Sequence, residues 1–280
     1  MFKCNSLVLL GLFGSLICSA ATAQEAQSGW KFSAMPYVWL PGIKADLKYG
    51  PPSGGSSSAN VSANESDVLS NLQMAFMIAG EARKGPWSIA TDYMYLDLGN
   101  IDSKVKSVDF NPGSGPVNVS TSQLGGSSET SFKGSIWTLA GGYAAINTPS
   151  ATLDVIAGFR YLGLEASSEW SLNAAVTSPN GTQTFNRTGG VKKTTDITSL
   201  IVGAKGRVNL GQGGWFIPYY ADIGGDGSNY TWQIAAGVGY EFKWGDVRMN
   251  YRHLVYGQDD EKMLQKIELG GFGVGANFRF

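Results

Sequence analysis

The chain is poor in cysteine, histidine and charge. Its two cysteines, Cys4 and Cys18, both lie in the first 23 residues, so the rest of the chain has no disulfide and must be held by packing and backbone pairing. The single histidine, His253, excludes a metal site built on several histidines. Charged residues make up 15% of the chain and the net charge is −1. A nucleic-acid-binding domain would carry basic patches, and this composition does not predict one.

Long apolar runs are also absent after the first 23 residues. The one such run, from about residue 6 to residue 20, follows Lys3 and precedes Ala21-Thr22-Ala23. A cation, a short apolar run and small residues in this order predict a secretory signal peptide over residues 1–23. The run is too short to favour a spanning helix of about 20 apolar residues.

Glycine and aromatic residues are abundant, with 38 glycines and 12% aromatics, and apolar residues recur at every second position. At the carboxyl end, Phe272, Val274, Ala276, Phe278 and Phe280 alternate with glycine or polar residues. A period of two predicts β-strands with two different faces. The pattern predicts ten strands, over residues 30–40, 72–83, 87–98, 132–146, 151–165, 198–210, 215–223, 230–244, 247–256 and 271–280.

The apolar face carries aromatic residues at both ends of several strands, as with Tyr230 and Trp232 against Phe242 and Trp244. This distribution is typical of a barrel whose outer face meets lipid and whose polar face lines a lumen. A soluble β-sandwich would also alternate, but it would place the polar face outward. A chain without spanning helices can cross a membrane only as a closed barrel of strands.

Short turns alternate along the chain with longer polar stretches at 41–71, 99–131 and 166–196, as expected for periplasmic turns and extracellular loops. We therefore predict an all-β fold over residues 24–280, a closed antiparallel transmembrane β-barrel of about ten strands, with eight or twelve as alternatives. Residues 43–49 also alternate and could form a rim hairpin. Residues 66–72 predict a short helix capped by Ser66 or Asp67; it could either narrow the lumen or be an ordered part of a loop.

Two stretches carry a family resemblance. "MPYVWLPGI" at 35–43 and "DVLSNLQMAFMIAGEARKGPWSIATDYMYLDLG" at 67–99 resemble a large family of uncharacterised proteobacterial outer-membrane β-barrel proteins. The resemblance implies a location in the outer membrane of a Gram-negative bacterium, and it implies no substrate or functional residue. The alternating last strand ending in Phe280 resembles the signal that the outer-membrane assembly machinery recognises.

Alternation predicts a set of charged residues on the inner face, seven cations and five acids. They would form either a network of ion pairs that fills the lumen or the lining of a narrow polar pore with slight anion preference. These residues are Glu81, Arg83, Asp92, Asp154, Arg160, Lys205, Arg207, Asp222, Glu241, Arg248, Arg252 and Arg279.

The same pattern places His253 on the outer face, close to Glu268 on the next strand. A lipid-facing dyad of this kind resembles lipid A deacylases, but no serine nucleophile lies near it. We therefore predict a protein that is not an enzyme and uses no cofactor or metal, with a lipid-face enzyme and an adhesive barrel that binds through its loops as alternatives. The expected partners are outer-membrane lipid, lipopolysaccharide and the assembly machinery, with no nucleic acid.

Overall fold

The computed structural model describes residues 29–49, 57–102, 104–105, 107–110, 117–120, 125–178, 181–258 and 264–280. The predicted signal peptide lies outside the described residues, as do parts of the three predicted loops. Within the described part of the chain, no helix is long and apolar enough to cross a membrane.

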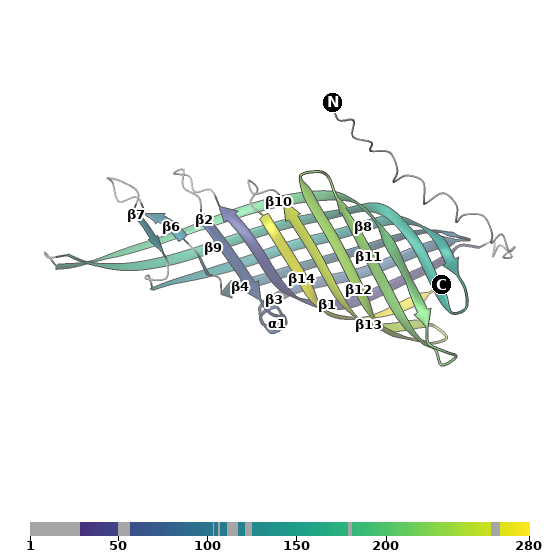
Figure 1. Ribbon diagram of the computed structural model, residues 1–280. Coiled ribbons are helices and arrows are strands. Elements are labelled where there is room, and N and C mark those ends of the chain that lie inside the picture. Colours follow the sequence, from purple (N-terminus) through teal and green to yellow (C-terminus); the bar gives the residue numbers. More distant parts are fainter. Residues whose placement is uncertain are drawn as a thin grey trace, which may run out of the picture.

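Ten antiparallel strands form a closed barrel (Figure 1), which confirms the predicted fold. Each strand pairs with its neighbours, and β14 pairs with β1 to close the sheet. In their order around the barrel the strands are β1 (Lys31–Tyr49), β3 (Leu72–Lys84), β4 (Trp87–Asp102), β8 (Gly125–Asn147), β9 (Ala151–Ser178), β10 (Gly181–Asn209), β11 (Trp215–Gly225), β12 (Asn229–Glu241), β13 (Gly245–Gln258) and β14 (Leu264–Arg279).

The last residue of the chain is held by this closure. The backbone N–H of Phe280 donates to the carbonyl of Phe32 at 2.9 Å, and the N–H of Phe32 donates to the carbonyl of Phe280 at 3.3 Å. The barrel therefore has no free edge where its two ends meet, and the aromatic terminus is fixed by backbone hydrogen bonds.

The short turns lie at the same end of the barrel as the carboxyl terminus. Between β3 and β4, Gly85 has a φ of +57°, and Gly214 before β11 has a φ of +78°. Glycine adopts these left-handed conformations without steric cost, which lets the chain reverse within a few residues. β12 ends at Glu241 rather than at residue 244 as predicted, because residues 242–244 form the turn to β13.

The strands at the other end are longer than predicted. Residues 166–196, predicted as a loop, continue β9 and β10 in unbroken antiparallel register as far as Ser178 and Gly181. β1 continues to Tyr49 and forms a hairpin with β2 (Ser57–Ala63), so residues 41–71 are not a simple loop. The stretch 99–131 contains the ends of β4 and β8 together with three short strands, β5 (Lys104–Val105), β6 (Ser107–Phe110) and β7 (Val117–Ser120).

The predicted helix is present as α1 (Glu65–Asn71), with a different cap. Asn64 is the N-cap: its side chain accepts from the N–H of Asp67 at 2.9 Å, and the Asp67 carboxylate accepts from the N–H of Asn64 at 3.1 Å. This reciprocal arrangement is a capping box. Figure 1 shows α1 at the lower edge of the barrel, and the helix contacts β1 and β4. Its Val68 is fully buried against the core.

The barrel has two halves of different character. We call the part nearest the carboxyl terminus the proximal half and the remainder the distal half; on β9 they meet between Tyr161 and Leu162. The proximal half exposes large apolar residues on its outer face, with Leu200 72% exposed and Ile223 65% exposed. The distal half buries its apolar residues inside, and β8, β9 and β10 extend it well beyond the rest of the barrel (Figure 1).

Candidate functional site

Charged side chains meet inside the proximal half, and the topology shows that they meet across the lumen. Arg83 on β3 pairs with Asp154 on β9, although β4 and β8 separate these strands in the sheet. Arg252 on β13 likewise pairs with Asp92 on β4 at 2.8 Å. Residues on strands that are not neighbours can make such contacts only through the interior.

One cluster lies near the proximal mouth. Arg83 donates from Nη1 to Asp154 Oδ1 at 3.2 Å and from Nε to Glu81 Oε1 at 2.9 Å. Lys205 on β10 forms an ion pair with the second oxygen of Glu81. Two cations and two acids from three strands therefore neutralise one another.

A second mouth cluster is centred on Glu241 of β12. Arg279 Nη1 donates to Glu241 Oε1 at 2.6 Å, and Arg207 Nη1 lies 3.0 Å from Glu241 Oε2. Arg279 lies on β14 and Arg207 lies on β10. The Glu241 carboxylate therefore connects strands on both sides of β12.

Asp246 is an inward acid that the sequence prediction missed. Its carboxylate is fully buried and accepts from Arg248 Nε at 2.5 Å, Arg279 Nη2 at 2.6 Å and Asn277 Nδ2 at 3.0 Å. The residue precedes the strand predicted over residues 247–256, and the surrounding "KWGD" is typical of a short turn. Its alternation with Arg248, Asn250 and Arg252 is the signal that could have found it.

Arg160 occupies the middle of the lumen and is fully buried. It binds both oxygens of Asp222 on β11, with a distance of 2.9 Å from Nη1 to Oδ1. Nε donates to Thr138 Oγ1 at 3.1 Å, and Nη2 donates to the Tyr220 hydroxyl at 3.4 Å. Removing two charges from water is costly, and only bidentate geometry with further hydrogen bonds offsets the cost.

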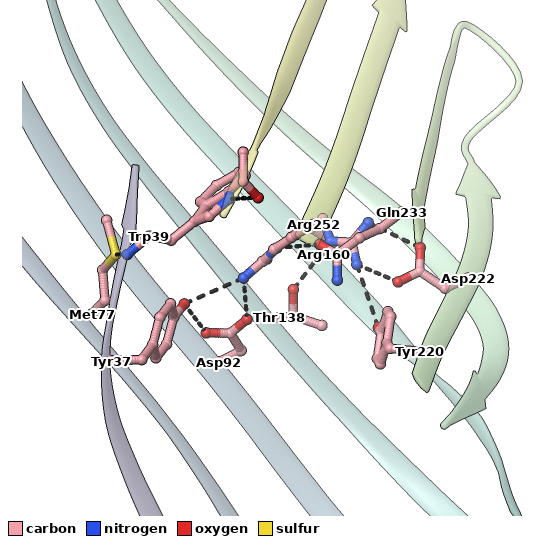
Figure 2. A network of polar contacts seen from close by, with 11 residues as sticks. Tyr37, Trp39, Met77, Asp92, Thr138, Arg160, Tyr220, Asp222, Gln233 and Arg252 are labelled. Atoms are coloured by element: carbon pink, nitrogen blue, oxygen red, sulfur yellow. Dashed lines mark hydrogen bonds and ion pairs between the residues drawn. The ribbon is translucent and has the colours of Figure 1, made fainter. Parts of the chain in front are cut away.

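Arg252 forms the other part of this central layer (Figure 2). Its Nη1 donates to Asp92, which also accepts from the Tyr37 hydroxyl at 2.5 Å, and its Nε donates to Gln233 at 3.0 Å. The guanidinium carbon lies 4.9 Å from the ring centroid of Trp39. Figure 2 shows Arg160 and Arg252 in the middle of the lumen, between Asp92 and Asp222. We call Asp92, Arg160, Asp222 and Arg252 the central belt.

The distal half is apolar inside. Trp39 marks the boundary, and beyond it Met94, Leu98, Leu162 and Leu164 pack into one buried cluster. The gap left between these side chains is a cavity of about 40 Å³ with an apolar lining. An ion that passed the central belt would have to cross this apolar region, where aliphatic side chains cannot replace its hydration shell.

The structure places all twelve predicted residues in these contacts, and each of the seven cations has an ion-pair partner. With Asp246 the inward acids of the described strands become six rather than five, and the β1–β3 register adds one cation at the mouth, Lys31, which lies opposite Arg83. Several uncharged members of the network were not singled out from the sequence, namely Tyr37, Thr138, Tyr220, Gln233 and Asn277.

His253 is not part of this network. Its ring lies 5.1 Å from that of Trp232, and its partner in the ladder to β14 is Gly270. Glu268, the candidate partner, forms an ion pair with Lys266 at 2.5 Å. In the part of the chain that the structure describes, no group of three or more His, Cys, Asp or Glu residues could hold a metal ion.

Comparison with known proteins gives distant likenesses between barrels. No protein-family model and no curated protein sequence matches the chain. Among solved structures, Ail, the attachment invasion locus protein of Yersinia pestis, is 10% identical with a TM-score of 0.31, and the match covers 90% of this chain and 99% of that chain. The translocator domain of the autotransporter NalP from Neisseria meningitidis is 16% identical (TM-score 0.34; 91% and 90% covered). The Pseudomonas putida toluene transporter TodX is 10% identical (TM-score 0.30; 92% and 90% covered). These likenesses are too distant to indicate a function for this chain.

Proposed function

We propose that the protein is a non-enzymatic outer-membrane β-barrel whose lumen is sealed to ions and which serves as a rigid anchor for its distal half outside the cell. The observation that carries the proposal is the filled interior: the inward cations of the proximal half are paired, and the distal half closes above them with an apolar core. A filled barrel of this kind is suited to a mechanical role as an anchor, whereas an open pore is not.

Insertion in a membrane is supported by the outer face of the proximal half. Large apolar side chains cover it, and a soluble protein rarely exposes so large an apolar surface. Aromatic pairs lie at both margins of this surface. Trp87 and Tyr143 are 4.9 Å apart near the short turns, and Trp137 and Phe159 are 5.2 Å apart at the opposite margin. Aromatic side chains favour the interfacial level on both sides of a bilayer.

The signal peptide and the family resemblance support the outer membrane of a Gram-negative bacterium as the location. Lipopolysaccharide and phospholipid would surround the outer face there. The assembly machinery would recognise β14, whose alternation ends at Phe280.

The alternative is a narrow polar pore with slight anion preference. One observation favours it: on the described strands the inward cations, the seven predicted ones together with Lys31, outnumber the six inward acids. In that case the central belt would be the selectivity filter, and an anion would pass beside Arg160 and Arg252.

The test is single-channel recording with residues 24–280 refolded into a planar bilayer, after the folded state has been verified by its heat-dependent migration on a gel. The sealed barrel is expected to give no discrete current steps. Steps with anion preference that Arg252→Gln reduces would overturn the proposal in favour of the pore, because this change removes one belt cation and keeps a hydrogen-bonding side chain.

Adhesion is a second candidate, favoured by the long continuation of β9 and β10 beyond the barrel. Glu169 and Gly190 are partners in this ladder, so residues 170–189 can be replaced by an Asn-Gly turn without changing the register. If the distal sheet is a binding surface, whole cells that display the shortened protein should bind host matrix less than cells with the full chain. Equal binding at equal surface abundance would remove this candidate.

A further inference from the structure

The outer face of the proximal half is not uniformly covered by large side chains. A groove of about 540 Å³ crosses β3, β4, β8 and β9 close to the short turns. Its volume lies within the range of roughly 300–1,000 Å³ in which proteins bind small molecules. The remaining question is which molecule it would hold.

Small residues form the floor of the groove. The strand register aligns Ala82, Ile89, Gly141 and Ala157 in one row across the four strands. Three of these four positions carry at most a methyl group, whereas the next residue of the row on β10 is Val202. The floor is therefore lowest at Gly141 and Ala157, between the larger exposed side chains of Ile89 and Val202.

Aromatic side chains form the walls. Trp30 lies at the β3 end, and Trp87 and Tyr143 stand beside the row on the side of the short turns. Trp87 is 65% exposed and Tyr143 is 47% exposed, and their rings meet edge to face. The walls place the open end of the groove at the level where aromatic residues meet lipid headgroups.

A cation lies beside that end. Lys84 is exposed at the last position of β3, and its Nζ is 5.8 Å from the ring centroid of Trp30. The nearby acids Glu81 and Asp154 face the lumen and are held there by Arg83 and Lys205. The outer surface at this point therefore has positive charge next to an apolar groove.

We propose that the groove holds one glycerophospholipid of the periplasmic leaflet, with an acyl chain lying over Gly141 and its phosphate beside Lys84. The proposal rests on the membrane insertion proposed above. A flexible acyl chain can reach a floor that lies between raised aromatic rings. The convex wall of a second barrel would contact the rings first, so a second copy of this chain fits the shape less well.

Two substitutions test the two parts of the site. Gly141→Leu fills the floor, and its Cβ would be in ordinary van der Waals contact at 3.9 Å from its nearest neighbour, the carbonyl of Ala157. Lys84→Gln removes the cation and keeps a polar, though shorter, side chain. Ala236→Leu is the matched control for the first, since Ala236 is a small outward residue on β12. Lys243→Gln, at another short turn, is the matched control for the second.

The measurement is native mass spectrometry of the detergent-solubilised barrel titrated with phosphatidylglycerol, and with diacylglycerol as the probe that lacks phosphate. We expect the wild-type chain to retain one phosphatidylglycerol. Gly141→Leu should weaken retention roughly tenfold or more by steric exclusion, and Lys84→Gln about fivefold, as for loss of one cation beside an anionic headgroup. Both controls should behave as wild type.

Equal retention by all five proteins would overturn the proposal, as would equal retention of the two lipids. A dimer that Gly141→Leu dissociates would assign the groove to a second copy of the chain and would also overturn it. Insertion into vesicles and folding are scored separately on the same samples. Failure of the lipid site is thereby distinguished from failure of the membrane barrel itself.

Discussion

Along β9 the apolar residues change from the outer face to the inner face. In the proximal half Val155 is exposed outside, while Asp154 and Arg160 are buried inside. Only a few residues further on, Leu162 and Leu164 are buried inside, and Glu165 lies outside, where it pairs with Lys192 on β10. The strand itself does not change, because its ladder with β10 runs through this point without a register shift.

The same strand geometry is therefore compatible with lipid around the proximal half and with water around the distal half. Successive side chains point to opposite faces in both halves. Where the outer face meets lipid, the apolar residues are outside and the polar ones fill the lumen. Where the outer face meets water, the order is that of a soluble barrel with its own hydrophobic core. The distal half is therefore a folded structure in its own right rather than a set of loops.

The largest effect is expected from breaking the central belt. Arg160→Ala leaves the buried carboxylate of Asp222 without its partner and should lower the free energy of unfolding by about 3–5 kcal/mol. Urea unfolding in lipid vesicles, followed by tryptophan fluorescence, measures the change. The double variant Arg160→Met with Asp222→Leu should recover most of the loss. Arg207→Ala, at the partly exposed mouth, is the comparison. If Arg160→Ala lowered the free energy of unfolding no more than Arg207→Ala does, the central belt would not be what stabilises the proximal half.

A smaller loss is expected from the distal core. Leu164→Ala removes three buried carbons beside the existing cavity and should cost about 3 kcal/mol. Leu200→Ala is the matched change on the lipid face. Lipid can refill the space there, so this variant loses the favourable burial of the removed carbons but leaves no cavity. Its free energy of unfolding should therefore fall by less. Equal costs in the same urea titration would argue that the distal half has no packed core.

A charge placed on the outer face should separate the two halves directly. Val202→Arg puts a cation on the lipid side of β10 and should cost about 2 kcal/mol. Thr194→Arg changes the same face of the same strand in the distal half, where water can solvate the cation, and should be neutral. Comparable losses at both positions would place the membrane boundary beyond Thr194 and contradict the division between the halves.

The smallest effect is expected from a distal surface ion pair. Lys192→Ala removes the contact of 2.7 Å with Glu165, and both side chains remain partly exposed to water. Such pairs contribute little, so the free energy of unfolding should change by less than about 0.5 kcal/mol. A loss of several kcal/mol would show that Glu165 lies in a dry environment and that lipid or another sheet covers this face.

The ten strands of the barrel could be predicted because their proximal parts keep apolar residues outward with a period of two. The distal continuation of β9 and β10 could not, because the residues that face outward there, such as Lys192, Thr194 and Asp196, are polar. A polar segment between two lipid-facing strands has the composition of a loop. Its strands pair because the proximal parts of β9 and β10 are already paired and the ladder continues in the same register. The sequence of the segment alone does not show this.

Much of the charged interior could also be predicted, since charge on the polar face of a lipid-facing strand must point inward. The partners could not be assigned, because Arg160 meets Asp222 and Arg252 meets Asp92 only once the barrel closes. Asp246 was missed because an acid next to Gly245 is typical of a turn. The apolar interior of the distal half was not expected either, since residues such as Met94 and Leu98 lie on the face assigned to the polar lumen.

The hydrogen bonds between Phe32 and Phe280 have a consequence for the order of events during folding. The two residues that seal the sheet are separated by nearly the whole chain, so this is the contact with the greatest loop-closure entropy. The seam between β1 and β14 can form only after β14 has been delivered to the membrane. Until then, every intermediate carries two unpaired edges that could pair with another chain. We therefore expect the chain to depend on escort from synthesis to insertion, because its topology leaves both edges unpaired until the last strand arrives.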